Sequence, residues 1–177
     1  DHIPNTPKQI MLFEAFGKKP PRYAHHSLLV GADRKPLSKR HGATRVSEFR
    51  DMGILESALV NYIAVIGRSV KKEVMDEREL METFSLKSLS ASDSLFDTSK
   101  LVWFNKEHMG RMPLGDLIAR AGLGAEYSEK VALLRENATT LTEMKVFLDI
   151  FEGTAIADDG IAYLSRIAAL GSLAATV

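Results

Sequence analysis

Apolar side chains recur at helical spacing over most of this chain, and that pattern restricts the fold more than any other feature. Between Leu55 and Ile66 the apolar residues fall mostly three or four positions apart, which places them on one face of a helix. Nothing alternates with period two over a useful length, so an extensive β-sheet is not expected. The sequence therefore predicts a mainly α fold. Further helices are predicted at residues 7–16, 77–84, 97–109, 114–121, 127–136, 140–151 and 158–170.

Local signals predict where these helices begin and end. Asp76 with Glu79, and Thr140 with Glu143, have the spacing of capping boxes, in which two side chains bind the free backbone N–H groups of a first turn. Glycines that follow apolar stretches are expected to end helices, because glycine readily adopts positive φ. The other boundary signals are Asn5 or Thr6 capping the first helix, Ser47 capping a brief turn through Phe49, and the stops Gly17, Gly53 and Gly67.

The composition excludes several classes of protein. The 177 residues include no cysteine, which rules out disulfides and thiolate metal sites. The most apolar stretch, residues 55–67, is interrupted by Glu56, Asn61 and Tyr62, so no membrane-spanning helix is expected. Lys and Arg number 23, as do Asp and Glu, giving zero net charge, whereas proteins that bind nucleic acid through charge alone are usually basic.

Basic residues are nevertheless concentrated in one segment, residues 18–50, which has nine Lys and Arg residues and two acidic residues. A local excess of this size can contact phosphate groups even on a protein without net charge. Within the segment, Ser27–Val30 is the only good candidate for a short buried strand. A polar loop is expected to follow it, over residues 31–42.

The polar loop contains the sequence Pro36-Leu37-Ser38-Lys39-Arg40-His41-Gly42. An ammonium group at Lys39 can follow a phosphate as charge builds on it, and the Arg40 guanidinium offers a planar fork for oxygens. With the Ser38 hydroxyl, these groups could stabilise the transition state in which ATP loses pyrophosphate. The alternative is a solvated basic turn, and the loop is not a Walker motif.

The loop lies in an ordered series of short motifs. Asp1-His2, Asn5-Thr6-Pro7-Lys8-Gln9 and Tyr23-Ala24-His25 precede it, and Arg50-Asp51-Met52-Gly53 and Glu56–Tyr62 follow it. This series resembles bacterial glutamyl-tRNA synthetase, whose pattern reads DH-x-x-NTPRQ, YAH, KLSKRHGA and then AL-x-NY. The loop itself is similar to the KMSKS loop, the second signature of class I aminoacyl-tRNA synthetases. The similarity is specific through about residue 67, weaker at residues 96–105, and limited to the helical layout and residues 140–143 beyond Pro113.

The resemblance implies a glutamate–tRNA ligase. That family activates glutamate with ATP as glutamyl-adenylate, usually with tRNA bound, and esterifies it to the 3′ end of tRNA(Glu). By the same resemblance Lys39 is the catalytic residue, and Ser38, Lys39 and Arg40 bind the ATP phosphates. Mg²⁺ is implied by the family, but no metal ligand is assigned and no cofactor is expected to bind this fragment alone. Pro36 stands where the motif has its first lysine, which Lys35 replaces only in part.

The resemblance also implies that the chain is a C-terminal fragment that starts inside the catalytic domain. The HIGH signature and the parallel strands of the nucleotide-binding sheet are absent and are expected upstream of Asp1, so the fragment alone is predicted to be inactive. The expected parts are the end of the catalytic domain with the KMSKS-type loop (1–45), a helical stem-contact domain (46–110) and an incomplete helical anticodon-binding subdomain (111–177). The whole protein is expected to be a cytoplasmic monomer without membrane contact.

Two other classes of function remain open at this stage, a non-catalytic tRNA- or RNA-binding helical module and a helical protein-interaction scaffold. Several other side chains are interpreted structurally rather than functionally. His25-His26 lack further ligands at metal-binding spacing, and His41 is expected to orient the loop. Trp103 is expected in the core rather than stacked on a base, and Asp158-Asp159 are interpreted as a helix cap.

Overall fold

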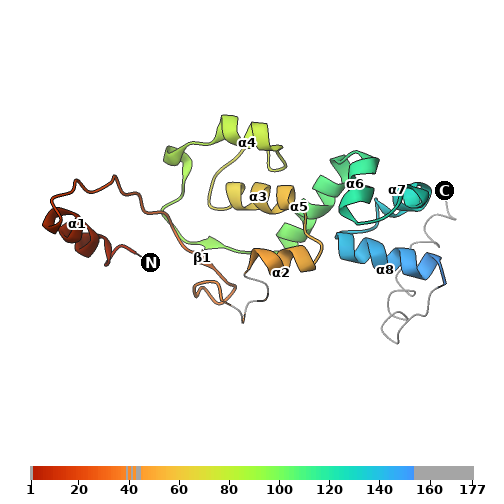
Figure 1. The fold of residues 1–177 in the computed structure, drawn as a ribbon, viewed down its shortest axis with the longest axis horizontal. Coiled ribbons are helices and arrows are strands. Elements are labelled where there is room, and N and C mark those ends of the chain that lie inside the picture. The colour runs from red at the N-terminus through yellow and green to blue at the C-terminus, as the bar shows by residue number, and fades with distance from the viewer. Residues whose placement is uncertain (1, 39, 41, 43–44, 154–177) are drawn as a thin grey trace. The chain divides into compact units, whose positions relative to one another are not determined.

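A computed structural model describes residues 2–38, 40, 42 and 45–153, and within them the chain is mainly helical (Figure 1). As far as they are described, residues 1–49 and 56–104 form one compact unit, called unit 1 below, and residues 50–55 and 105–177 form unit 2. Helix α5, Thr98–Arg111, contributes residues to both units. The helix predicted at residues 158–170 and its Asp158-Asp159 cap lie outside the described residues.

Helix α1, Thr6–Ala15, begins and ends close to where the sequence predicts. Pro7 lies in the first turn, where its missing N–H leaves no helical hydrogen bond unmade. The predicted side-chain cap is wrong: Asn5 is the N-cap but its side chain makes no capping bond, and Thr6 Oγ1 donates to the His2 carbonyl at 2.9 Å. The helix ends before Gly17, whose φ of 64° is the left-handed conformation expected of a stop.

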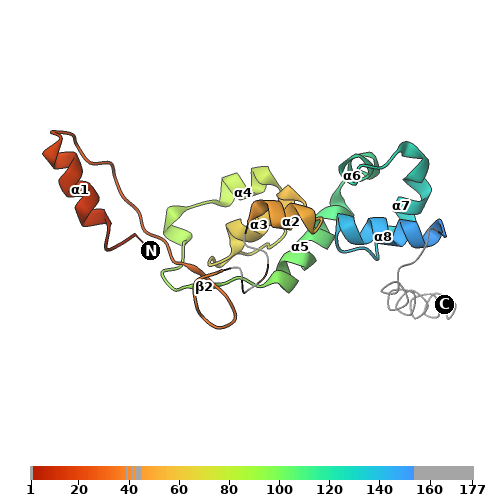
Figure 2. The same ribbon diagram turned by 60° about the horizontal axis from the view of Figure 1, so that its bottom comes forward.

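The predicted strand is present but short. Strand β1, Leu29–Val30, pairs in parallel with β2, Ser94–Leu95, and Figure 2 labels β2. No other named strand occurs in the described part of the chain. The sequence did not predict β2, because residues 85–94 are rich in serine and carry no alternating apolar pattern.

The core of unit 1 is aromatic and lies around α3, Glu56–Val65. Tyr62 packs edge-on against Phe96 with ring centres 5.3 Å apart, and against Phe104 at 5.5 Å. Phe49 completes the cluster, 5.7 Å from Phe96. All four rings are buried, so residues widely separated in sequence share one hydrophobic core.

Buried Asn61 fixes the segment that leads from α3 to α4. Its Nδ2 donates to the Glu73 carbonyl at 2.9 Å, and its Oδ1 accepts the Met75 N–H at 2.9 Å. Helix α4, Glu77–Thr83, then begins with the predicted capping box: Asp76 Oδ1 accepts the Glu79 N–H at 2.8 Å, and Glu79 Oε2 accepts the Asp76 N–H at 3.1 Å. That sequence prediction is confirmed.

Helix α2, Val46–Asp51, differs from its prediction at the N-terminus. Ser47 is inside the helix and is not its cap. Instead the Glu48 carboxylate accepts the Arg45 backbone N–H at 2.9 Å, and Arg45 Nε donates to the same side chain at 3.0 Å. A glutamate in the first turn therefore supplies the acceptor that the sequence interpretation assigned to serine.

Within the described residues, unit 2 is built from residues 50–55, the end of α5 and three further α-helices around a small apolar core. Helix α8 is capped by Thr140, whose Oγ1 accepts the Glu143 N–H at 3.0 Å, as predicted. The second half of that capping box differs, because the Glu143 carboxylate accepts from the N–H and hydroxyl of Thr139, at 2.7 and 2.6 Å. The helices are α6 (Leu114–Arg120), α7 (Ser128–Leu134) and α8 (Leu141–Phe151), and the fully buried side chains include Met109, Leu117, Val131 and Met144.

The core position predicted for Trp103 is wrong. Trp103 is 42% exposed on α5, whereas its neighbour Phe104 is fully buried. Consecutive helical residues point about 100° apart, so one of two adjacent aromatic rings faces the core and the other faces outward. The rings still touch, with centres 5.0 Å apart.

Candidate functional site

The predicted phosphate-binding loop is carried by a hairpin that folds back on β1. Val30 pairs with Pro36 as an isolated antiparallel bridge, and the Leu37 N–H donates to the Leu29 carbonyl at 2.9 Å. Pro36 occupies the non-hydrogen-bonded position of this pairing, where a residue without an N–H loses no ladder bond. The proline that departs from the family motif therefore fits the local backbone.

The turn of the hairpin, residues 31–35, is closed by backbone and side-chain hydrogen bonds. The Gly31 N–H donates to the Lys35 carbonyl at 2.9 Å, and the Arg34 N–H donates to the Gly31 carbonyl at 2.9 Å. Asp33 Oδ1 accepts the Lys35 N–H at 3.0 Å. Arg34 has φ of 61°, an uncommon and unfavourable conformation for a residue other than glycine. The hydrogen bonds of the turn offset this conformational cost.

Two of the three predicted phosphate ligands can be located. Ser38 is half-buried immediately after the hairpin, and Arg40 is exposed. Lys39 and His41 lie outside the described residues. Gly42 follows with φ of 98°, a conformation that an L side chain rarely adopts, so a glycine is required there.

Arg40, which follows the hairpin, forms an ion pair at 3.1 Å with Asp33 in the turn. Both side chains are largely exposed, 55% for Arg40 and 40% for Asp33, so the pair contributes at most about 1 kcal/mol. A polyphosphate, with more than one negative charge, can compete for Arg40 at that low cost. The ion pair therefore holds the loop in place without blocking an anion.

Most of the described basic side chains of residues 18–50 are exposed to solvent. Its second acidic residue, Glu48, pairs with Arg45 at 2.9 Å. Within the described part of the segment, the other basic side chains are exposed and have no ion pair. They are Lys18, Lys19, Arg22, Arg34, Lys35 and Arg50.

The root of the hairpin is anchored in the core of unit 1 through β2. The Phe96 N–H donates to the Val30 carbonyl at 2.9 Å, and the Phe96 ring packs on Tyr62. The next N–H, that of Asp97, donates to the Tyr62 hydroxyl at 2.7 Å. Burial raises the pKa of the Tyr62 phenol, against the opposing effect of the Asp97 N–H, so the phenol stays neutral and accepts this bond at neutral pH.

Two residues of this arrangement were not singled out from sequence. Asp33, which holds both Lys35 and Arg40, lies in a polar loop, where an aspartate before a turn is a usable signal for an Asx turn. Phe96 was noted only as a weak family match, and nothing in the sequence showed that it meets β1. A parallel pairing of two-residue strands leaves no periodic pattern.

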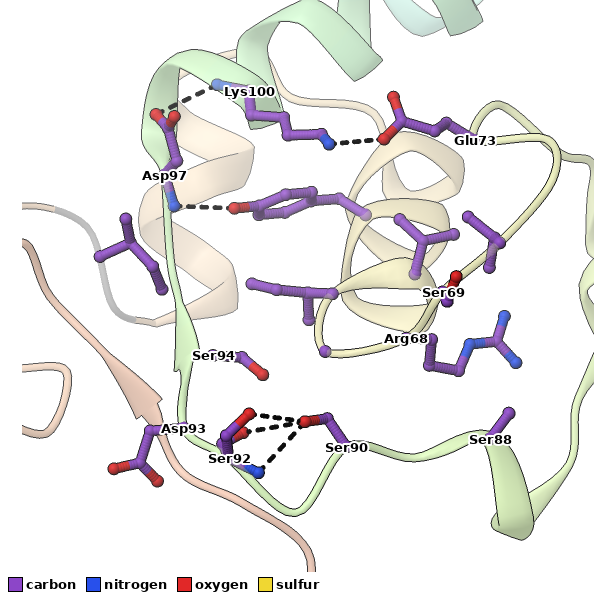
Figure 3. A pocket seen from close by; sticks show the side chains of 16 residues that line it. Arg68, Ser69, Glu73, Ser88, Ser90, Ser92, Asp93, Ser94, Asp97 and Lys100 are labelled. Atoms are coloured by element: carbon purple, nitrogen blue, oxygen red, sulfur yellow. Dashed lines mark hydrogen bonds and ion pairs between the residues drawn. The ribbon is translucent and has the colours of Figure 1, made fainter.

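Unit 1 also contains a cavity of about 860 Å³ with a mixed polar and apolar lining, formed by the end of α3, residues 66–70, Glu73 and several residues between 88 and 100 (Figure 3). Lys100 Nζ donates to Glu73 Oε1 at 2.6 Å on its wall. The Ser90 and Ser92 hydroxyls lie 2.8 Å apart.

The paired histidines have local hydrogen-bond partners. Thr6 Oγ1 lies 3.2 Å from His25 Nε2, and His26 Nδ1 lies 2.8 Å from the Ser27 carbonyl. In the part of the chain that the structure describes, no three His, Cys, Asp or Glu side chains gather as a metal site would require. Among the same residues, no helix has the length and apolarity needed to cross a membrane.

Comparison with known protein families gives an independent assignment. Residues 1–103 match the family described as tRNA synthetases class I (E and Q), catalytic domain. The chain is similar to Glutamate–tRNA ligase 2 of Fervidobacterium nodosum, with 41% identity over 155 residues, covering 83% of this chain and 33% of that protein. It is also similar to Glutamate–tRNA ligase 2 of Syntrophus aciditrophicus, with 47% identity over 122 residues, covering 68% of this chain and 25% of that protein.

A solved structure agrees with these relatives. A crystal structure of a glutamate tRNA ligase from Elizabethkingia meningosepticum, in complex with its amino acid, matches with a TM-score of 0.63 and 25% identity, over 81% of this chain and 34% of that one. The chain thus spans about a quarter to a third of the length of the proteins it resembles.

Proposed function

Because this chain belongs to the family of class I tRNA synthetases (E and Q), we propose that it is part of a glutamate–tRNA ligase. The complete protein forms glutamyl-adenylate from glutamate and ATP and transfers glutamate to the 3′ end of tRNA(Glu). The observation that carries this proposal is the Ser38-Lys39-Arg40 sequence directly after a hairpin anchored in the core of unit 1. Relatives at 41% and 47% identity, both named glutamate–tRNA ligase, support it.

In the proposed mechanism the loop acts by electrostatics. Lys39 neutralises the negative charge that develops as pyrophosphate leaves ATP, and it is the catalytic residue of this chain. Ser38 and Arg40 contact the phosphates on either side of it, Arg40 after release from its weak ion pair with Asp33. We assign no Mg²⁺ ligand here, since Asp33, the acidic residue of the hairpin, is engaged by Arg40 and by the Lys35 N–H.

Lys35 replaces the first lysine of the family motif only in part. It precedes the position where the family motif has its first lysine, and Pro36 occupies that position in the bridge with Val30. The Lys35 backbone is fixed by two hydrogen bonds of the turn, while its side chain is exposed and without an ion pair in the described segment. Its ammonium therefore contributes to the local potential more than to a specific phosphate contact.

The chain is proposed to have three parts, of which the second and third contact tRNA. Residues 1–45 are the end of the catalytic domain, residues 46–110 a stem-contact domain, and residues 111–177 part of an anticodon-binding subdomain. The protein is proposed to be bacterial, cytoplasmic and monomeric. Alone, this chain retains tRNA contacts and only weak ATP contact, so adenylate formation requires the rest of the ligase.

The experiment that tests this function is Lys39→Ala in the full-length ligase. ATP–pyrophosphate exchange with saturating glutamate and tRNA should slow by about 10²-fold, because one charge-stabilising group is removed from the transition state. The dissociation constant for tRNA(Glu) should change by less than about twofold, since a single phosphate contact is a small part of a tRNA interface. Lys19→Ala, an exposed lysine of the same basic segment, is the matched control and should leave the exchange rate unchanged.

Equal losses of exchange rate and tRNA affinity in Lys39→Ala would remove Lys39 from the chemical step. They would favour the second candidate function, a non-catalytic RNA-binding module. That alternative is supported by the six exposed basic side chains of the segment that have no ion pair among the described residues.

A further inference from the structure

Asp33 connects the turn of the hairpin to the Ser38-Lys39-Arg40 loop. Its Oδ1 accepts the Lys35 N–H at 3.0 Å, inside the turn. Its Oδ2 lies 3.1 Å from Arg40 Nη2, beyond the end of the hairpin. One carboxylate thus fixes a backbone turn with one oxygen and holds a cation of the proposed phosphate site with the other.

The hairpin, and not Arg40, fixes the position of the Asp33 carboxylate. The turn closes through the Gly31 N–H, which donates to the Lys35 carbonyl at 2.9 Å. Further along the hairpin, Val30 forms a bridge to the returning segment, and β1 pairs with β2 at the core of unit 1. Because none of these bonds involves Arg40, the carboxylate is expected to stay in place when Arg40 moves away.

Arg40 can leave this carboxylate at low cost. Its side chain is 55% exposed and that of Asp33 is 40% exposed, so the ion pair is weak and an anion in solution can reach the guanidinium. Since Oδ1 is engaged by the Lys35 N–H, the carboxylate offers Arg40 the single oxygen Oδ2. A terminal phosphate offers two or more oxygens to the planar fork of a guanidinium, and a polyphosphate carries several negative charges against one on the carboxylate.

We propose that Asp33 is a positioning residue that competes with the nucleotide phosphates for Arg40. Without a nucleotide, its Oδ2 holds the guanidinium beside the turn. When a polyphosphate binds, Arg40 transfers its hydrogen bonds from the carboxylate to phosphate oxygens. The carboxylate therefore weakens polyphosphate binding and keeps Arg40 at a defined position while the site is empty. This inference rests on the phosphate-binding role proposed for the loop.

The test is a titration of the 177-residue chain with inorganic pyrophosphate, followed by ¹H–¹⁵N NMR at the Arg40 Nε–H and at the amides of residues 31–37. Asp33→Asn keeps the Oδ1 acceptor for the Lys35 N–H but removes the charge that holds Arg40. Pyrophosphate should bind this variant about two- to fivefold more tightly than the unmodified chain, because the competing ion pair is weak.

A double-mutant cycle shows whether Asp33 acts through Arg40. Arg40→Gln should bind pyrophosphate more weakly than the unmodified chain, through loss of charge-assisted hydrogen bonds. In that background Asp33→Asn should tighten binding by less than half as much as it does alone, because the guanidinium that it would release is no longer present. Equal tightening in both backgrounds would mean that Asp33 acts only by general repulsion, and the competition for Arg40 would be overturned.

Glu48→Gln is the matched control, because Glu48 is the other acidic residue of the basic segment and pairs with Arg45. The substitution removes the same charge and keeps an acceptor for the Arg45 N–H, so it should change pyrophosphate affinity by less than half as much as Asp33→Asn. Equal tightening in the two variants, or unchanged or weaker binding in Asp33→Asn, would overturn the role of Asp33 and leave the phosphate-binding role of the loop intact. No saturable shift in the unmodified chain would overturn that role, and this inference with it.

Discussion

At the scale of single residues, the stability of unit 2 depends on the buried amide side chain of Asn105. Asn105 is fully buried; its Oδ1 accepts the Leu55 N–H at 2.7 Å, and its Nδ2 donates to the Thr139 carbonyl at 2.7 Å. Asn105→Ala would leave both backbone groups without a partner in the core. The free energy of unfolding in urea should fall by about 2–4 kcal/mol, the cost of two unsatisfied buried groups.

A matched control for this substitution is Asn5→Ala. Asn5 is exposed, and although it occupies the N-cap position of α1, its side chain makes no capping bond. Its replacement should change the unfolding free energy by no more than about 0.5 kcal/mol. Similar losses in the two variants would mean that the buried hydrogen bonds of Asn105 contribute no more to stability than the exposed Asn5 side chain does.

At the scale of elements, the link between α2 and α3 is held against the start of α8 by a glycine. Gly53 has φ of 78°, and its carbonyl accepts the Leu141 N–H at 3.0 Å. A Cβ at Gly53 would come within 2.8 Å of the Leu141 backbone nitrogen and would also collide with Thr142. Gly53→Ala should therefore destabilise the chain by well over the roughly 1–2 kcal/mol that positive φ alone costs an L residue.

The control separates backbone strain from steric collision. Gly17 has φ of 64°, and a Cβ there would meet nothing within 4 Å, so Gly17→Ala should show only the conformational cost. Urea unfolding of both variants measures the difference. Equal destabilisation would show that α8 moves aside at no cost, and the close approach at Gly53 would not then determine how unit 2 packs.

Most elements were predictable because their signals are local. Helices α3 and α6 coincide with segments in which apolar residues recur at helical spacing. The α4 capping box is formed by Asp76 and Glu79, which are three residues apart. Strand β2 was not predictable, because its only partner is a two-residue strand more than 60 residues earlier in the chain. The outward position of Trp103 was not predicted, because two adjacent aromatic residues on a helix point in different directions and only one of them, Phe104, is buried.

The sequence predicted which residues form the candidate loop, but not the hairpin and the ion pair that hold the loop. The Ser38-Lys39-Arg40 step was predicted from its residue types together with the resemblance of the surrounding motifs, since the residue types alone also fit a solvated basic turn. The hairpin that carries it depends on the bridge between Val30 and Pro36, and on Asp33 binding Arg40. Lys39, the residue with the most important proposed role, lies outside the described residues, so its role remains a prediction.

At the scale of the whole molecule, zero net charge conceals an uneven distribution. Nine basic residues and two acidic ones lie in residues 18–50, and both acidic residues are paired with arginines of the same segment. The other described cations of the segment are exposed, so in the tRNA complex proposed above this segment is where the chain should release counterions. The dependence of tRNA affinity on salt reports how many of these charges meet phosphates.

Neutralising Arg34 and Lys35 together, as Arg34→Gln with Lys35→Gln, tests that expectation. The slope of log affinity against log salt concentration should become less steep by about 1.4–1.8, because each of two lost phosphate contacts removes roughly 0.7–0.9 from it. Fluorescence anisotropy of labelled tRNA with the 177-residue chain, over about 50–200 mM salt, gives the slope. The pair Arg78→Gln with Lys87→Gln makes the same change in net charge outside the segment and, because Arg78 is already paired with Glu82, should change the slope by less than half as much. Equal changes from the two double variants would show that tRNA responds to overall charge and not to the hairpin, and the RNA-contact role of residues 18–50 would have to be abandoned.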